Sequence, residues 1–375
     1  MSGAQWRELF HEVVQTNLCT GCAACVMACP RDVLDYRTDT YRPVQIGDGM
    51  GIDECFHGDR GCDICTRACP RFRAWETELD QTLFGRERHP DEIAGVSRAN
   101  LLVRAKDHEV FTAGQDGGLV SALLIWGLAQ GHLDGVLTSK LADDRPFDAE
   151  PTVATTREEV LACAGSRYTY AANPLAMKDA EARGLKNLAL VGMSCQASIN
   201  AALPARGVRK YERRIALTLG LLCSKTFTYE GQAEVLASRG LSVDDVAKVN
   251  VKGRFMVWTK DGDYLEIPLK ELHPHTRQGC KLCPDFAAEH ADISTGGIGA
   301  DDEWTLAIVR TARGEAWMQE LIANDLIEVR QAEDDDVAMN LLTKLSTTSR
   351  KRWPTGVLPQ GHEQPGLLPV MEGGA

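Results

Sequence analysis

The chain has 375 residues, of which 44% are hydrophobic and 25% charged, as expected for a globular protein of two or three domains. Its formal charge of −12 at pH 7 argues against the broad basic face that non-specific binding to nucleic acid or to anionic lipid requires. The longest apolar run, Leu119–Ala129, is much shorter than the about 20 residues of a membrane-spanning helix, and the chain does not open on a secretory signal, so we expect a cytoplasmic protein.

Cysteine is concentrated at the start of the chain, which has 13 cysteines, most of them before residue 70. In a cytoplasmic protein such clustering indicates metal ligands before disulfides. The first run, Cys19 to Cys29 followed by Pro30, has the spacing C-x2-C-x2-C-x3-C-P of bacterial ferredoxins. In this pattern three thiolates bind one [4Fe-4S] cubane, and the fourth, just before the proline, binds a second one.

A second run ends in the same way at Cys69-Pro70, but six residues instead of two separate its first cysteines, Cys55 and Cys62. The two runs together predict two cubanes with crossed ligands. The predicted ligands are Cys19, Cys22, Cys25 and Cys69 for the first cluster, and Cys55, Cys62, Cys65 and Cys29 for the second. The alternatives are zinc sites, whose ligands usually come as two separated C-x2-C pairs, or buried free thiols.

The middle of the chain starts with a polar linker that contains a helix, followed by an apolar strand at Leu101–Ala105. A glycine-containing loop, Thr112–Gly118, then opens an apolar helix that begins at Leu119. Glycines let a ligand approach the backbone, and a helix N-terminus favours phosphate. The dinucleotide fingerprint G-x-G-x-x-G is absent, so an ordinary helix cap is the alternative.

Strands and helices then alternate, which predicts an α/β sheet covered by helices. The expected elements are Gly135–Ser139, Arg157–Ala164, Pro174–Arg183, Leu188–Val191, Ser194–Ala202 and Ile215–Leu222. They are followed by a β-rich stretch with a turn (Val246–Ile267), a glycine loop (Ser294–Gly299), a strand (Trp304–Val309), a helix from Arg313 and a tail rich in Pro and Gly after Trp353.

Four later cysteines lie where an α/β sheet builds its sites. Cys195 and Cys223 follow predicted strands, whose ends converge on one edge of the sheet, and Cys280 and Cys283 form a C-x2-C pair. These four thiols are candidates for a third cluster, with small buried side chains as the alternative. Cys163 remains, and we interpret it as a buried thiol in a helix.

We therefore expect a mixed fold, α+β or α/β in class, in which a bacterial ferredoxin-like 2×[4Fe-4S] domain precedes a mixed α/β domain. The predicted boundaries are 1–80 for the ferredoxin-like domain, 81–97 for a linker, 98–330 for the α/β domain, and 331–375 for a C-terminal helix and the tail.

Short segments of the α/β domain also occur in a specific order: Gly117–Leu123, Gly165–Tyr168, Val191–Gln196, Gly220–Cys223, Cys280–Phe286, Ala291–Gly299 and Arg310-Thr311. With these segments, residues from about 98 to 320 resemble the coenzyme F420 hydrogenase/dehydrogenase beta-subunit family. One departure is Met193-Ser194, where the family usually has Thr-Pro before the cysteine.

The resemblance implies a flavin-binding domain that holds FAD, a site for the deazaflavin coenzyme F420 beside it, and an iron-sulfur cluster bound by Cys195, Cys223, Cys280 and Cys283. The candidate FAD contacts are Gly117, Gly118, Ser121, Ser166, Arg167 and Tyr168. The deazaflavin tail is anionic, and arginine suits phosphate. Candidate cations in or beside the matched segments are Arg167, Lys225, Lys252, Arg254, Arg277, Lys281 and Arg310, each of which can equally be a solvated surface charge.

The implied activity is oxidation of reduced F420 by hydride transfer to FAD, with single electrons passing through the clusters. The implied acceptor is soluble ferredoxin or a larger complex (a respiratory dehydrogenase arm, a hydrogenase or a formate dehydrogenase), which can also place the chain on the cytoplasmic face of a membrane. No catalytic acid, base or nucleophile is assigned. The alternatives are a ferredoxin-dependent reductase of a chlorophyll-type ring, a formate dehydrogenase or hydrogenase beta subunit, and an electron-transfer or assembly subunit with a vestigial flavin site.

Overall fold

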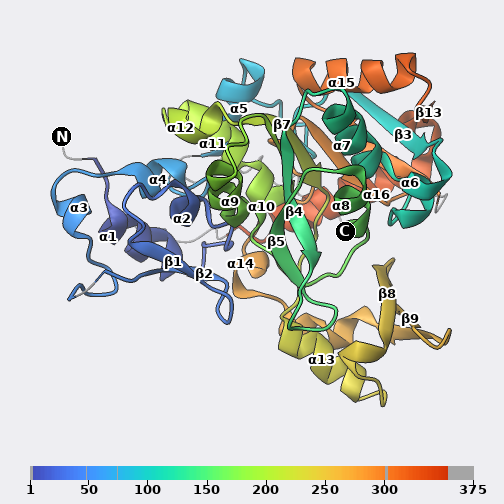
Figure 1. Ribbon diagram of the computed structural model, residues 1–375, viewed down its shortest axis with the longest axis horizontal. Helices are drawn as coiled ribbons and strands as arrows, with labels where there is room; N and C mark the ends of the chain where they lie inside the picture. The colour runs from blue at the N-terminus through green and yellow to red at the C-terminus, as the bar shows by residue number, and fades with distance from the viewer. Residues whose placement is uncertain (1–2, 48, 74, 300–302, 354–375) are drawn as a thin grey trace, which may run out of the picture.

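The computed structural model describes residues 3–47, 49–73, 75–299 and 303–353. Three parts are visible in Figure 1: an N-terminal module (residues 3–70), a body built on a large sheet, and a small lobe (residues 227–276) that lies below the body in that view. The tail predicted after Trp353 lies outside the described residues. Among the described helices, none combines the length and the apolar character needed to cross a bilayer.

The body is organised around an eight-stranded mixed sheet, so the predicted mixed α/β class is confirmed. The strands β11, β7, β6 and β4 are parallel in that order at its centre, and antiparallel strands flank them on both sides. In spatial order the strands are β13 (Ile327–Gln331), β3 (Ala99–Ala105), β12 (Thr305–Val309), β11 (Ile293–Gly296), β7 (Ile215–Leu221), β6 (Leu188–Met193), β4 (Gly135–Leu141) and β5 (Ala149–Ala154).

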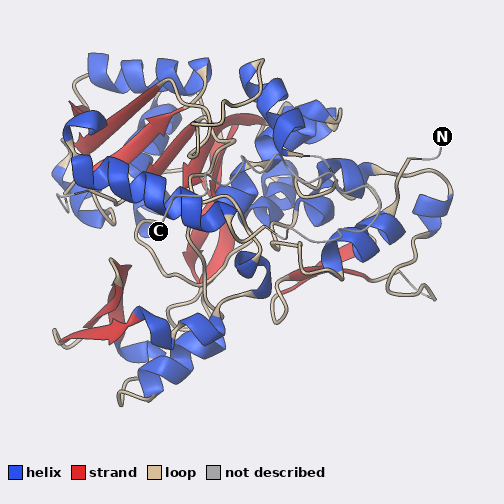
Figure 2. Cartoon of the chain, turned by 180° about the vertical axis from the view of Figure 1, so that it is seen from behind, coloured by secondary structure: helices blue, strands red, loops and turns tan. Residues whose placement is uncertain are grey.

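Helices cover both faces of this sheet, as Figure 2 shows from behind. Alternate residues of β3 point to opposite faces: Leu101 and Val103 pack with the helices α7 and α15, while Leu102 packs with α16. The body helices are α6 (His108–Ala113), α7 (Leu119–Ala129), α8 (Arg157–Ala162), η2 (Asn173–Ala176), α9 (Met177–Ala182), α10 (Ser194–Ala197), α11 (Ile199–Ala205), α12 (Arg209–Glu212), α14 (Gln278–Lys281), α15 (Ala312–Ala323), η6 (Ala332–Asp334) and α16 (Asp336–Arg350). The C-terminal helix α16 thus packs on the body.

Most of the expected elements are present, and the differences lie where tertiary pairing outweighs local signals. The prediction of a loop over the whole of Ser294–Gly299 is wrong, because its first three residues belong to β11, which is paired between β7 and β12. The strand β5 was not expected. It contains Pro151 and lies at the edge of the sheet, where a residue without an N–H group is tolerated.

The N-terminal module consists of short helices and one antiparallel hairpin, β1 paired with β2. Its elements are α1 (Trp6–Leu9), a π-helical turn η1 (Phe10–Val14), α2 (Ala24–Ala28), β1 (Leu34–Arg37), β2 (Arg42–Gln45), α3 (Phe56–Asp59) and α4 (Ile64–Ala68). The helices α2 and α4 pack against each other. The module shares its apolar core with the body, since Leu9 and Val13 lie in one cluster with Tyr170 and Ala201.

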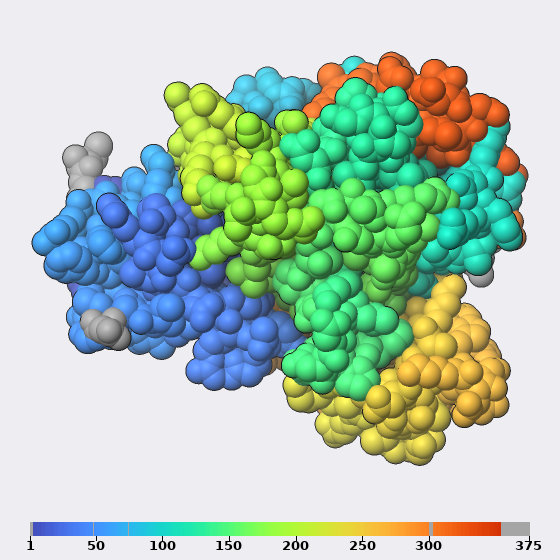
Figure 3. All heavy atoms as spheres, in the orientation of Figure 1, coloured from blue at the N-terminus to red at the C-terminus, as the bar shows by residue number. Residues whose placement is uncertain are grey.

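The lobe is a three-stranded antiparallel sheet covered by one helix, and the space-filling view in Figure 3 shows it protruding from the body. It contains α13 (Tyr229–Ala237), η3 (Val243–Asp245), β8 (Val246–Val251), β9 (Arg254–Thr259), β10 (Tyr264–Pro268), η4 (Leu269–Glu271) and η5 (His273–His275). The predicted β-rich stretch with a turn after β9 is therefore present.

The linker is held to the body by buried charges rather than by apolar contacts alone. The segment between the module and the body contains α5 (Glu76–Phe84), so the boundary predicted between residues 80 and 81 falls inside a helix, and a following loop carries Arg88. Arg88 contacts Asp80 at 2.6 Å and also pairs with Glu289 of the body. Arg350 of α16 reaches the same site, with 2.6 Å to Glu289 and 2.9 Å to Glu76. This network ties the linker, the body and the C-terminal helix together.

Candidate functional site

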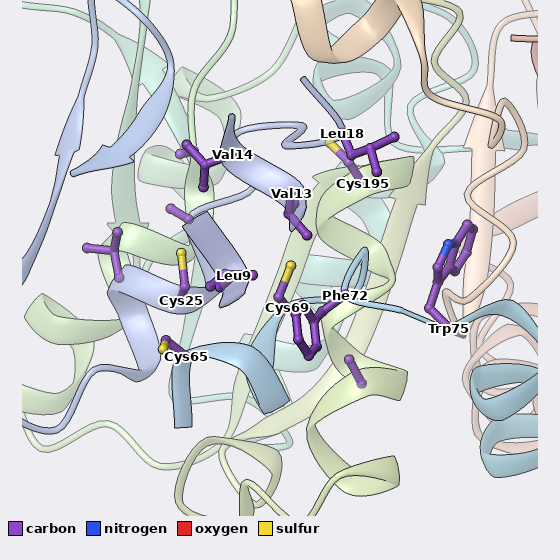
Figure 4. Packing of buried hydrophobic residues seen from close by; sticks show 14 of the residues in the cluster. Leu9, Val13, Val14, Leu18, Cys25, Cys65, Cys69, Phe72, Trp75 and Cys195 are labelled. Carbon is purple, nitrogen blue, oxygen red and sulfur yellow. The ribbon is translucent and has the colours of Figure 1, made fainter. Parts of the chain in front are cut away.

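The cysteines of the N-terminal module form two groups, each drawing on both runs. The first group is Cys19, Cys22, Cys25 and Cys69. Burial, and next the nearby sulfur of Cys69, raises the pKa of Cys22 to about 12. The same two causes, burial and then Cys69, raise the pKa of Cys25 well above its usual value. Figure 4 shows Cys25 and Cys69 among the apolar side chains that surround this group.

The second group is Cys29, Cys55, Cys62 and Cys65, and its four members line one cavity together with Trp6 and His57. Burial, and next the sulfurs of Cys62 and Cys29, raises the pKa of Cys65 to about 12. Cys55 and Cys62 are half-buried, so the second group lies closer to solvent than the first. The structure thus brings the cysteines together in the crossed combination that the spacing predicted.

The third group is Cys195, Cys223, Cys280 and Cys283, which come from separate elements of the body. Cys195 lies in α10 directly after β6, and Cys223 follows β7, at the same edge of the parallel sheet. Burial, and then Cys280, Cys195 and Cys283 in that order, raises the pKa of Cys223 well above its usual value. The neighbouring strands β6 and β7 and the helix α14 therefore bring together four thiols that are up to 88 residues apart in the chain (195 to 283).

The first and third groups are neighbours across the interface between the module and the body. After burial, the sulfur of Cys22 is the largest influence on the pKa of Cys195, which is about 11. The backbone also makes a close approach here, because a Cβ atom at Gly279 would overlap the carbonyl oxygen of Cys19. The first group therefore lies between the second group and the third group.

The buried thiols of these groups are poor free thiolates. Burial raises the pKa of Cys22, Cys195 and Cys283, and coordination to a metal would release their protons. Among the described residues, no three His, Cys, Asp or Glu side chains are arranged to hold one single metal ion. A cubane is a larger group and distributes its four thiolates over four irons.

Several of the candidate FAD residues meet beside the third group. The side chain of Gln115 accepts a hydrogen bond from the backbone N–H of Ser166 at 3.1 Å and donates to the carbonyl of Val249 at 3.3 Å. The hydroxyl of Tyr168 donates to Asn250 at 3.0 Å, and Lys252 forms an ion pair with Asp116 at 3.0 Å. Two loops, around residues 115–118 and 166–168, thus converge with the end of β8 and Lys252.

The predicted glycines in this region also have backbone roles. Gly118 has a φ of +77° and caps α7, and a Cβ atom at Gly117 would overlap the carbonyl oxygen of Val103. Ser121 is buried in the first turn of α7. The loop and helix start are therefore fixed against the sheet, which gives any ligand there a rigid surface.

The remaining candidate cations are not gathered in one place. Arg167 folds back to the carbonyls of Cys163 and Gly165, and Arg254 is exposed and paired with Glu266 across the β9–β10 hairpin. Arg310 is 1% exposed, and its guanidinium donates to Ser294 and to backbone carbonyls. Lys225 is half-buried near the third group, and burial, followed by Arg352, lowers its pKa.

Two functional candidates were missed or misread in the sequence. Arg277, expected to be a candidate for an anionic tail, is 4% exposed and contacts the sulfur of Cys280 at 3.9 Å. Arg71 is 1% exposed and contacts Cys283 at 4.0 Å. Its position two residues after Cys69 was the only signal in the sequence. Cys163 is half-buried, and no other cysteine is among the groups that influence its pKa.

Comparisons with known proteins agree with this arrangement. Residues 185–335 match the family described as the C terminus of the coenzyme F420 hydrogenase/dehydrogenase beta subunit, and residues 101–178 match its N-terminal counterpart. Residues 12–35, which contain the first cysteine run, match the family described as a 4Fe-4S binding domain.

Individual relatives cover either the body or nearly the whole chain. The chain is 36% identical to coenzyme F420 hydrogenase subunit beta of Methanococcus voltae over 69% of its length and 93% of that protein. It is 28% identical to an F(420)H(2) dehydrogenase subunit from Methanosarcina mazei over 91% of both chains. Its structure is similar to a chain in the F420-reducing [NiFe] hydrogenase complex from Methanosarcina barkeri, with a TM-score of 0.67, 30% identity, and coverage of 71% of this chain and 92% of that one.

Proposed function

This chain belongs to the coenzyme F420 hydrogenase/dehydrogenase beta-subunit family, and we propose that it oxidises reduced coenzyme F420 by hydride transfer to FAD and passes the electrons singly through [4Fe-4S] clusters to a partner. The observation that carries the proposal is the succession of three four-cysteine groups, of which the third adjoins the convergence of loops around Gln115, Tyr168 and Lys252. Tyr168 marks this junction, because its pKa is influenced both by Asp116 of the glycine loop and by Cys223 of the third group.

The donor sets fit the proposed groups. The four thiols of each group match the number of ligands that a cubane requires, and the guanidinium nitrogens of Arg71 and Arg277 provide cations beside the third group. The residues that would hold FAD are Gly117, Gly118, Ser121, Ser166 and Tyr168, with Lys252 as a nearby cation. Arg254 and Arg310 are left out of this proposal, because one is in a surface ion pair and the other is fully engaged by the protein.

A bound flavin supplies the conversion between a two-electron hydride donor and one-electron carriers. The chain's own residues would position the flavin and shield the cysteine groups from solvent. Tyr168 fixes the end of β8 through its hydrogen bond to Asn250 and by accepting a hydrogen bond from the backbone N–H of Val251 at 3.0 Å. The module covers the first and third groups, since Cys22, Cys25, Cys69 and Cys195 are all buried. These four side chains are therefore shielded from solvent.

We propose the second group as the exit point for electrons. Its members Cys55 and Cys62 are half-buried, whereas most cysteines of the first group are buried. The relative from Methanosarcina mazei is named as a dehydrogenase subunit, and the similar structure is part of a hydrogenase complex. A partner subunit or a soluble ferredoxin that docks near Cys55 would receive the electrons.

The test is anaerobic purification followed by three measurements on the full chain: flavin content, iron and acid-labile sulfide, and recovery of F420 absorbance with reduced F420 and a viologen dye. The proposal expects bound FAD, about twelve irons per chain for three cubanes, and turnover that requires both reduced F420 and the dye. Loaded protein without turnover would refute it. Pigment binding without an F420 response would favour a reductase of a chlorophyll-type ring, and flavin-free protein that still holds clusters would favour an electron-transfer subunit.

A further inference from the structure

Arg71 and Arg277 are buried cations without a carboxylate partner in the described part of the chain. Among the described residues neither forms an ion pair within 4.0 Å, whereas the buried Arg88 and Arg350 do. Nε and Nη1 of Arg71 and Nε of Arg277 are buried there without a hydrogen-bond acceptor. An uncompensated buried charge is strongly destabilising, so we expect a negatively charged group to bind beside each guanidinium.

Both guanidinium groups lie between the first and third cysteine groups. Arg71 contacts Cys283 of the third group and influences the pKa values of Cys22 and Cys69 in the first. It stacks on Trp75 with 3.9 Å from its Cζ to the ring centre. Asp285 acts electrostatically on Arg71, but the two side chains form no ion pair within 4.0 Å in the described part of the chain.

Arg277 lies on another side of the same interface. It donates to the carbonyl oxygen of Thr20, within the first cysteine run, at 2.8 Å and contacts Cys280 at 3.9 Å. Its guanidinium stacks on Tyr170 at 3.5 Å, and the hydroxyl of Tyr170 lies 3.5 Å from the sulfur of Cys195. Packing therefore holds the cation in place against both groups.

We propose that Arg71 and Arg277 are an electrostatic screen between the first and third clusters, which raises the reduction potentials of both and allows both to be reduced at once. The inference rests on the proposed function. A cubane bound by four thiolates is negatively charged and becomes more so on accepting an electron, so a reduced neighbour opposes its reduction. Two fixed cations between the clusters oppose that repulsion, and the burial of both side chains strengthens the effect because solvent screens them little.

The experiment is an anaerobic redox titration of the full chain, with dithionite as reductant and redox mediators, followed by electron paramagnetic resonance. The variants are Arg71→Gln, Arg277→Gln, Arg71→Lys and Arg277→Lys. The matched control is Arg37→Gln, which removes an exposed guanidinium paired with Asp39 on the β1–β2 hairpin. The second cluster is an internal reference, because neither Arg71 nor Arg277 is among the groups that influence Cys65.

We expect each glutamine variant to disfavour reduction of the first and third clusters at least ten-fold, which is about 59 mV for a one-electron couple. The lysine variants and Arg37→Gln should stay within a few-fold of the wild type. Loss of the third cluster in Arg71→Gln with retention in Arg71→Lys also supports the proposal, because it shows that charge is required.

Unshifted potentials in both glutamine variants at full iron content would overturn this inference and leave the proposed function standing. Equal shifts, or equal cluster loss, in the glutamine and lysine variants would overturn it as well, because shape rather than charge would then matter. A wild-type chain without iron-sulfur signals would overturn both proposals.

Discussion

The replacement Cys195→Ala tests the third cysteine group most directly. Cys195 lies at the carboxyl end of β6, and its sulfur interacts with Cys280 of the same group and with Cys22 of the neighbouring one. If three cubanes are present, removal of one ligand should cost one of them, or about four of about twelve irons. The first and second groups should be retained, because their eight sulfurs come from other residues.

The cost to folding should be small compared with this loss of iron. Removing the sulfur leaves the hydroxyl of Tyr170 without its partner at 3.5 Å, which costs about 1–3 kcal/mol. A decrease of one third in iron and labile sulfide, with an unfolding transition still present by circular dichroism, therefore reports ligand loss rather than unfolding.

Cys163→Ala is the matched control. This cysteine is half-buried in the same body, and no other cysteine influences its pKa. We expect unchanged iron, labile sulfide and F420-dependent dye reduction. Full iron content in Cys195→Ala, or the same decrease in Cys163→Ala, would refute the assignment of the third group.

Three further predictions concern the contacts that hold the site together. Arg88→Leu should destabilise the fold by about 3–5 kcal/mol, because it removes one cation from a buried network and leaves Asp80 with His290 and Glu289 with Arg350. A denaturant midpoint equal to that of the wild type would contradict this. Burial acts to raise the pKa of Asp80, but the hydrogen bonds from His290 and Arg88 outweigh it, so the pKa is lowered. The contribution of Asp80 to stability is therefore present above about pH 4, the pKa of the unfolded state, and is lost as the pH falls below that value. Asp80→Asn should accordingly flatten the decrease in stability at acid pH. Gly279→Ala should weaken the contact of α14 with the loop at Cys19 by about 1–3 kcal/mol and reduce cluster content, whereas the same change at the exposed Gly240, which has open space around it, should leave cluster content unchanged.

Local spacing was sufficient to predict the two cysteine runs and their crossed grouping. In each run a short helix, α2 or α4, carries one cysteine, and the next cysteine ends it just before a proline. Such relationships span few residues, so they follow from the order of residues alone. The alternation of strands and helices from Gly135 to Leu222 could also be predicted, because buried strands and helices have distinct apolar patterns.

The sequence could not predict the surroundings of the third group. Cys195 and Cys223 follow the neighbouring strands β6 and β7, whereas Cys280 in α14 and Cys283 after it join them only after the chain has passed through the lobe. Arg310, a candidate ligand for an anion, instead satisfies carbonyls inside the body, since only packing decides which cations remain available.

The chain's residues by themselves determine its family, its cysteine runs and its mixed α/β class. Only the tertiary structure decides that the module shares a core with the body, and that Arg71 and Arg277 lie between two cysteine groups rather than at the surface. The reason is physical: spacing fixes what one or two helical turns bring together, whereas burial and charge compensation depend on contacts between segments far apart in the chain.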